Sequence, residues 1–463
     1  MGTKTDTPLF IFPSCFLSIG ESTQMLQHAD RVHLVRRLGE PVATTVITVL
    51  ASLVAWFRVP PSARDVLWAE DARIFLQRAA DHALPEWIST PYAGYSHAVP
   101  QATASLVWDL VPIELRAVAV TAAACVIVGS VAGLIFLFTR DWGLGLAGRL
   151  LFAGITVLAP GLGYETLGNL TNLHWYLLWL APFLFLFRPR SWWVSALLCV
   201  VALFLLATEI QAVLFLPLLL WSVRDLRRWP IAAGAVLGAG IQVVAYVSHE
   251  AVRGQSGANL SATLLGYLLQ VPLTAFTGSG PSSSALVGRA GWWIAVTALI
   301  PFLACAVWFA WASIRRALLA SLFLVASIII WSTGFWLNFL PEFDFAALSD
   351  ADLRSGVPLL RYATPAVMFL FAPVALAIGR IHMACASAPG VATTAIAVLL
   401  CLAVFTAGLI RADHPIRADG PTWRSLLPTA RTMCDSAGTD SAIIQAAPHG
   451  WSIAVPCRVL QNP

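Results

Sequence analysis

Residues 188–228 read RPRSWWVSALLCVVALFLLATEIQAVLFLPLLLWSVRDLRR, and this stretch decides the fold class. Two apolar runs meet at Thr208 and Glu209, and arginines precede the first run and follow the second. A bilayer-spanning helix needs about 20 mostly apolar residues, so the stretch predicts spans at 191–208 and 209–223, with a broken helix as the alternative. Short loops rich in Lys and Arg stay cytoplasmic, which places Glu209 on the outer side.

The same alternation continues along the chain. Arginines occupy every second gap between apolar runs, at Arg36, Arg37, Arg140, Arg149, Arg188, Arg190, Arg224, Arg227, Arg228, Arg315, Arg316 and Arg380. The apolar runs are 41–57, 117–139, 150–163, 172–187, 191–208, 209–223, 230–248, 290–314, 317–340, 359–379 and 389–410. They predict an all-α polytopic membrane protein with about 11 transmembrane helices. We expect a bacterial cytoplasmic membrane, with the N-terminus inside and the C-terminal tail outside.

The composition agrees with this class. Of the 463 residues, 58% are hydrophobic and 11% are charged, whereas soluble domains carry about 25% charged residues. The formal charge of +4 comes from the cytoplasmic arginines, and no basic tract indicates a nucleic-acid partner. We therefore expect contacts with membrane lipid and none with nucleic acid.

The pattern divides the chain into parts. Residues 1–40 form an N-terminal extension that we expect to be cytoplasmic and disordered. Residues 41–410 form the transmembrane module, with 58–116 as a long first outer loop. Segment 264–278 is apolar but interrupted by Pro and Gly, and counting it as a span would put Arg315 outside. It therefore predicts a re-entrant or interfacial helix.

The last part is a small, loop-rich outer tail, residues 411–463. So short a segment cannot build a core without help. Cys434 and Cys457 lie in it, and outside the cytoplasm a disulfide between them is permitted. No CxxC motif or Cys/His cluster has the spacing of a zinc site, so we assign no metal ligands.

The first outer loop carries two adjacent carboxylates. Residues 68–75 read WAEDARIF, with Glu70 and Asp71 at the centre. Neighbours on a helix point about 100° apart, so one carboxylate can face a cavity while the other binds a neighbouring segment. The alternative is that the pair caps a helix N-terminus.

With this acidic pair in a long first outer loop, the chain resembles the GT-C superfamily of membrane glycosyltransferases. It is also similar to actinobacterial membrane proteins in which W-x-E-D and a downstream P-Y-x-G-Y recur. Here the second element supplies Tyr92, Tyr95 and His97 as candidate substrate-binding residues. The resemblance implies a polyprenyl-phosphate sugar donor, an envelope glycan, lipid or protein acceptor, and inversion by a carboxylate base. We expect Asp71 to be that base, with Glu70 as second choice or as ligand of a divalent metal ion.

Such a transfer also needs positive charge on the leaving phosphate. Arginine suits this role because its planar fork bonds two phosphate oxygens. The outer candidates for this role are Arg73, Arg253, Arg289, Arg354 and Arg361. Arg361 begins a span directly after an outer loop, which favours it as the phosphate ligand, and snorkelling to the interface is the alternative.

A second polar group lies between the third and fourth predicted spans, in the sequence GYETLGNLTNLHW. It contains Glu165, Asn169, Asn172 and His174. Asn and His are costly where they face lipid, so we expect them to line a polar cavity that recognises sugar hydroxyls. Helix capping beside an aromatic belt is the alternative. Glu209 either reaches the same cavity, as a second carboxylate or metal ligand, or caps the span that follows it.

A glycosyltransferase is the first hypothesis because it accounts together for the topology, the acidic first loop and the outer polar group. A transporter or flippase for a lipid-linked or envelope precursor is the alternative, and it predicts charged or broken helices near the bilayer midplane. A structural or assembly protein is the third reading, and it predicts that Asp71→Ala is tolerated.

Overall fold

The structure is a computed structural model. It describes residues 19–81, 91–162, 164–222, 224–248, 257–384, 399, 401, 406, 414–436 and 439–461, with only the backbone of 19–38, 222 and 381–384. The chain divides into two units, Met1–Thr45 and Val46–Pro463. In the first unit the described residues belong to helix α1 (Ile19–Arg58). The predicted disordered extension therefore lies outside the described residues at 1–18, and residues 19–40 are helical.

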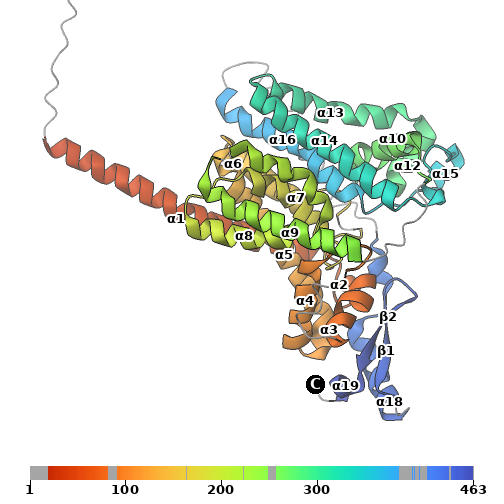
Figure 1. The fold of residues 1–463 in the computed structure, drawn as a ribbon. Coiled ribbons are helices and arrows are strands. Elements are labelled where there is room, and N and C mark those ends of the chain that lie inside the picture. The colour runs from red at the N-terminus through yellow and green to blue at the C-terminus, as the bar shows by residue number, and fades with distance from the viewer. Residues whose placement is uncertain are drawn as a thin grey trace, which may run out of the picture. The chain divides into compact units, whose positions relative to one another are not determined.

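The second unit is predominantly helical (Figure 1). Its longer helices are α4 (Ala98–Leu110), α5 (Arg116–Phe138), α6 (Leu146–Leu158), α7 (Leu173–Leu186), α8 (Trp192–Leu206), η5 (Ile210–Ser222), α9 (Trp229–Ser248), α10 (Leu260–Leu268), α12 (Gly280–Ala290), α13 (Trp293–Ala310), α14 (Ile314–Leu337), α16 (Ala363–Ala384) and α18 (Trp423–Ser436). Short helical pieces are α2 (Pro61–Arg64), η1 (Asp71–Leu76), α3 (Gln77–Asp81), η3 (Ile113–Leu115), η4 (Thr139–Asp141), η6 (Leu226–Arg228), η7 (Leu269–Leu273), α11 (Thr274–Thr277), η8 (Pro341–Phe343), α15 (Asp350–Ser355), η9 (Ile416–Asp419) and α19 (Cys457–Gln461). Strands β1 (Ser441–Ala446) and β2 (Trp451–Pro456) pair as an antiparallel hairpin.

The apolar helices indicate a multi-pass membrane protein. Among the described residues, 7 helices are long and apolar enough to cross a membrane, and four shorter apolar helices, α6, α7, α8 and η5, lie between them. Every predicted run from 41–57 to 359–379 falls on a helix. The run 389–410 lies outside the described residues except at positions 399, 401 and 406, so the expected number of spans stays a prediction.

Helix α7 is the centre of the bundle, because its side chains from Leu173 to Phe185 are buried on every side. A helix that is apolar all round belongs in a core, which is what its sequence predicts. Next to it, η5 is a 3-10 helix of 13 residues. At about 2.0 Å rise per residue it covers roughly 26 Å, close to the thickness of a bilayer core.

The break between α8 and η5 falls at Thr208 and Glu209. The Glu209 carboxylate accepts the backbone N–H of Gln211 at 2.7 Å, and the Thr208 hydroxyl accepts the backbone N–H of Val99 at 3.0 Å. The predicted capping role of Glu209 is therefore confirmed. The broken helix that the sequence allowed is also observed.

Within the second unit, the arginines of the predicted cytoplasmic loops gather at one end of the bundle, which we call the basic end. Arg190 forms an ion pair with Asp141 at 3.0 Å, and Arg227 donates to the carbonyl of Arg190 at 2.9 Å. Arg380 donates to the carbonyl of Trp308 at 2.6 Å. Glu70, Glu165 and Glu209 lie at the opposite, acidic end. The alternation read from the sequence is therefore a real separation of charge along the bundle.

The segment from α10 to α12 forms a helical hairpin. It starts beside the C-terminal part of α14, where Trp331 donates to the carbonyl of Thr263 at 2.9 Å. After the turn at Gly278 it returns to the same end, where Arg354 of α15 donates to the carbonyl of Gly288 at 2.9 Å. The predicted re-entrant or interfacial placement stays a prediction, because Leu260–Thr277 is by itself long and apolar enough to span.

The tail has more regular structure than the sequence predicted. Helix α18 packs on β1, and a disulfide joins Cys434 to Cys457, which confirms the predicted bridge. Because of the hairpin β1–β2, the fold is not purely helical, as the all-α prediction required. Period-2 alternation is present in Ser441–Ala446, whose residues are alternately exposed and buried, but the strand is short.

The tail also docks on the first outer loop. Gln77 exchanges two hydrogen bonds with the backbone of Ala454, at 3.2 and 2.7 Å. Trp423 is buried and donates to the carbonyl of Ile113 at 2.6 Å. The predicted first outer loop and the predicted tail therefore fold together.

Candidate functional site

Four segments of the second unit meet at the acidic end. They are the start of η1 with Glu70 and Asp71, the turn 91–97, the connection 164–172 between α6 and α7, and the residues just before α16. The structure thus brings most of the predicted site residues together. The contacts of these residues differ from one to the next.

Asp71 is fully buried and holds the α6–α7 connection. Its carboxylate accepts the backbone N–H groups of Leu170 at 3.0 Å and Thr171 at 2.9 Å, and the Thr171 hydroxyl at 2.7 Å. Burial raises the pKa of Asp71 to about 6, although these hydrogen bonds act in the opposite direction. A carboxylate enclosed in this way does not face an acceptor hydroxyl. The geometry therefore favours a positioning role for Asp71 over the predicted role as base.

Glu70 points the other way, toward Arg361. The Arg361 guanidinium lies 3.9 Å from Glu70 Oε1 and 3.5 Å from Glu165 Oε1. Glu70 Oε2 is buried and has no hydrogen-bond partner in the part of the chain that the structure describes. An unpaired carboxylate oxygen inside a protein is costly, so this oxygen calls for a partner such as a water molecule or a ligand group.

Charge holds this cluster together. Burial raises the pKa of Glu165, and the neighbouring Arg361 guanidinium opposes that rise. Burial alone would lower the pKa of Arg361, but Glu165, Tyr362 and Glu70 together raise it above its ordinary value. Arg361 is therefore a permanent cation between two carboxylates, and its side chain is still 33% exposed.

The segment Tyr92–Tyr95 is a tight turn. The backbones of Tyr92 and Tyr95 exchange hydrogen bonds at 3.0 and 3.2 Å. The two residues between them, Ala93 and Gly94, have φ of 53° and 83°. Positive φ at both central positions is the type I′ geometry, which explains the glycine of the P-Y-x-G-Y element. The turn directs both tyrosines toward His97.

Aromatic rings line this part of the site. The ring centroids of Tyr95 and His97 are 4.1 Å apart, and those of Tyr92 and His97 are 5.7 Å apart. Burial, with His174 nearby, lowers the pKa of His97 to about 3. His97 is therefore neutral at physiological pH and cannot neutralise a phosphate.

His174 and Glu209 form a buried pair, in which His174 Nδ1 contacts a Glu209 carboxylate oxygen. The His174 ring lies 6.3 Å from His97 between centroids. Glu209 therefore caps η5 and pairs with His174. Its role as a second carboxylate or metal ligand in a cavity stays a prediction.

Asn169 and Asn172 mainly stabilise their own connection. The Asn169 side chain donates to the carbonyl of Glu165, and its amide oxygen accepts the backbone N–H of Asn172 at 2.9 Å. The Asn172 side chain donates to the same amide oxygen at 2.9 Å. These bonds lie within the connection, and the N-terminus of α7 at Asn172 has no side-chain cap hydrogen bond. Sugar recognition by the two side chains stays a prediction.

Arg417 is a charged residue that the sequence reasoning missed. It comes from the tail, is buried, and donates to the carbonyl of Gly168 and to the Thr121 hydroxyl, the latter at 3.4 Å. Burial lowers the pKa of Arg417 to about 10, while the charge of Asp71 raises it. The tail carries several arginines, and nothing in the sequence singles out Arg417 for this contact.

The other outer arginines are placed differently. Arg73 is exposed, and its guanidinium lies 5.8 Å from the ring centroid of Trp451. Arg289 is also exposed, and Arg354 donates a hydrogen bond to a backbone carbonyl of α12. Arg253 lies outside the described residues. Arg78, which the sequence did not single out, donates to the carbonyl of Pro91 at 3.1 Å and lies near Tyr92. Arg361 is thus the outer arginine that the structure places against Glu70.

No group of three or more His, Cys, Asp and Glu side chains among the described residues is arranged to hold a metal ion. A divalent ion at Glu70 or Glu209 therefore stays a prediction. The cavity beside Glu165 and Arg417 is small, about 10 Å³, whereas a cavity of about 830 Å³ lies at the basic end.

No protein-family model, curated protein or solved structure matches this chain.

Proposed function

We propose that this protein is a membrane glycosyltransferase of the GT-C type. It transfers a sugar from a polyprenyl-phosphate donor to a cell-envelope acceptor at the acidic end of the bundle. The observation that carries the proposal is the cluster of Glu70, Arg361 and Glu165, in which an unpaired carboxylate oxygen lies beside a permanent cation.

Glu70 is the base in this mechanism. Its unpaired Oε2 takes the proton of the acceptor hydroxyl as the acceptor oxygen bonds to the anomeric carbon. The bond from that carbon to the phosphate oxygen breaks on the opposite face, so the configuration inverts. The electron pair leaves with the lipid phosphate.

Arg361 receives the leaving phosphate. At 3.9 and 3.5 Å its contacts with Glu70 and Glu165 are longer than good hydrogen bonds, so phosphate oxygens would compete well for its N–H groups. Glu165 keeps the guanidinium in place while the donor is absent.

The remaining residues shape the site. Asp71 fixes the connection that carries Glu165, through Leu170 and Thr171. Tyr92, Tyr95 and His97 offer ring faces and polar edges of the kind that bind sugars. His174, paired with Glu209, closes the inner side of this aromatic group.

The test compares the two neighbouring carboxylates in purified protein, with polyprenyl-phosphate mannose, arabinose and glucose as donors. Glu70→Gln should melt at the wild-type temperature and lose transfer by about two to four orders of magnitude, the usual contribution of a general base. Asp71→Asn should lose less transfer per folded molecule. Glu342→Gln is the matched control, because Glu342 is exposed in an outer loop and should leave transfer unchanged.

Two results would contradict this assignment. If Glu70→Gln keeps wild-type transfer and Asp71→Asn is inactive while folded, Asp71 is the base. If the double variant transfers sugar as the wild type does, the acidic pair has no part in the chemistry.

A further inference from the structure

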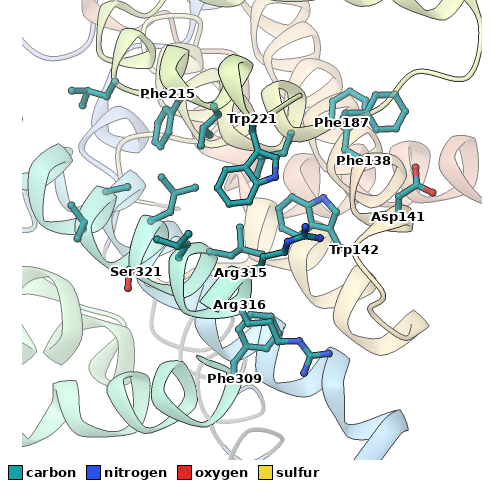
Figure 2. A pocket seen from close by; sticks show the side chains of 18 of the residues that line it. Phe138, Asp141, Trp142, Phe187, Phe215, Trp221, Phe309, Arg315, Arg316 and Ser321 are labelled. Atoms are coloured by element: carbon teal, nitrogen blue, oxygen red, sulfur yellow. The ribbon is translucent and has the colours of Figure 1, made fainter. Parts of the chain in front are cut away.

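A cavity of about 830 Å³ opens at the basic end, between η5 and α14 (Figure 2). It is far from the acidic cluster, and the proposed transfer does not use it. Its wall is largely aromatic and aliphatic, formed by Phe138, Trp142, Phe187, Phe215, Trp221 and Phe309 with leucines of both helices. Such a wall fits a hydrocarbon chain.

The cavity opens sideways on the surface of the apolar bundle. Leu214, Leu318 and Val325 line it and are 47%, 49% and 51% exposed. In a membrane-spanning bundle, surface of this kind faces lipid tails. A lipid chain can therefore enter from the bilayer without passing through water.

One end of the cavity is positively charged. Arg188, Arg315 and Arg316 line it, together with Asp141. Asp141 is already paired with Arg190 at 3.0 Å and Arg140 at 3.3 Å. Figure 2 shows the Arg315 side chain extending toward the indole of Trp142, with Trp221 beside it.

These arginines are not neutralised. In the described part of the chain neither Arg315 nor Arg316 has a carboxylate partner within 4.0 Å. Arg228 is buried near Arg188 and Asp225, and its three guanidinium nitrogens have no hydrogen-bond partner among the described residues. An anion that carries a hydrocarbon chain complements unpaired cations at the end of an apolar groove.

We propose that this groove binds one anionic membrane phospholipid. A hydrocarbon chain lies along η5 and α14, and the phosphate lies on Arg315 and Arg316, within the field of Arg188 and Arg228. A phospholipid fits better than a lipid-linked sugar, because the cavity lies at the end opposite Glu70 and anionic phospholipids are abundant at the membrane surface that basic residues face. The proposal is independent of the proposed transferase activity.

The experiment measures lipid retained by the detergent-purified full chain, by native mass spectrometry, with thermal melting in mixed micelles as the second readout. Wild type should retain one phosphatidylglycerol and melt at a higher temperature with it than with phosphatidylcholine. Arg315→Gln/Arg316→Gln should bind phosphatidylglycerol on the order of thirtyfold more weakly, as expected for losing two cations near a lipid phosphate.

Two further variants test the charge and the apolar groove separately. Arg224→Gln/Arg227→Gln removes the same charge from exposed arginines of the same end that do not line the cavity, and it should bind as wild type does. Leu322→Trp fills the groove without changing charge and should also displace the lipid.

Equal retention of phosphatidylglycerol and phosphatidylcholine by wild type would overturn the proposal, as would equal losses in the two double arginine variants. Preferential retention of polyprenyl phosphate over phosphatidylglycerol would also overturn it. If free glycerol phosphate alone raises the melting temperature, the groove binds no hydrocarbon chain, and the proposal is again overturned.

Discussion

Glu70 and Asp71 are neighbours in sequence and opposites in environment. The side chain of Asp71 points into the α6–α7 connection, where backbone N–H groups and Thr171 satisfy it. The side chain of Glu70 points to Arg361 and keeps one oxygen unpaired. The angle between successive residues of a helical turn is enough to separate a fully hydrogen-bonded carboxylate from one that keeps an unpaired oxygen.

The buried carboxylate should make stability depend on pH. The pKa of Asp71 rises from its ordinary value near 3.8 to about 6 in the folded protein, so between these values only the unfolded chain is ionised. The folded state then binds more protons, and stability falls as pH rises through this window, by roughly 3 kcal/mol in total. The melting temperature of wild type should drop between pH 4 and 6, and that of Asp71→Asn should drop less. Parallel melting curves for the two proteins would show that Asp71 is ionised across the whole range.

Arg361 tests the phosphate contact. Lysine keeps the charge but lacks the fork, so Arg361→Lys and Arg361→Ala should both lower kcat/KM, with the alanine variant losing on the order of 2–5 kcal/mol of transition-state binding. Arg289→Ala removes an exposed outer arginine and serves as the control. Full activity in Arg361→Ala would exclude Arg361 from the site and direct attention to Arg78 and Arg73, which lie near Tyr92.

The site could be predicted in part at this scale. Residue types and topology gave the segments that converge, since acids, Asn and His do not face lipid. The orientation of the two carboxylates could not be predicted. Whether Glu70 or Asp71 faces the α6–α7 connection depends on the side on which that connection packs. Arg417 could not be predicted either, since its contact with the Gly168 carbonyl joins segments that are distant in sequence.

At the scale of elements, α8 and α9 show how closely helices pack in this protein. A Cβ on Gly234 would lie 2.1 Å from the carbonyl oxygen of Cys199, and one on Gly238 would lie 2.4 Å from that of Leu203. Glycines on one face of α9 therefore let its backbone touch α8. Close approach through small residues is a common way for membrane helices to associate.

Gly234→Ala should separate these two helices. Alanine favours a helix over glycine by about 1 kcal/mol, so any loss of stability measures the clash against Cys199. We expect a net destabilisation of about 1–3 kcal/mol, seen as a lower melting temperature in detergent. Gly240→Ala, in the same helix with no atom within 4 Å of its Cβ, should not be destabilised. Equal melting temperatures for the two variants would mean that α8 shifts away without cost.

The elements themselves follow largely from apolar runs, because a span needs a length that few other structures need. Apolar content alone did not distinguish an α-helix from the 3-10 helix that the structure has at Ile210–Ser222. The hairpin in the tail was also missed. Its strands are short, and contacts with Gln77 and α18 stabilise them more than their own alternation does.

For the whole molecule, the separation of charge predicts orientation. The basic end should be cytoplasmic, and the acidic end with the tail should be outside. In intact cells an impermeant maleimide should label Ser425→Cys, which is exposed in α18, and should leave Arg224→Cys unlabelled until the membrane is opened. The reverse labelling pattern would mean that the protein has the opposite orientation in the membrane. Labelling of both positions would mean that the two ends are not on opposite sides.

Arg417 has a consequence for how the protein is made. The ribosome delivers Glu70 and Asp71 early and Arg417 late, yet the Arg417 side chain supports the connection that carries Glu165 from behind. The site is therefore incomplete during most of membrane insertion, and it forms only when the tail has reached the side of the first outer loop. A partly inserted chain therefore lacks the support that Arg417 gives to this connection.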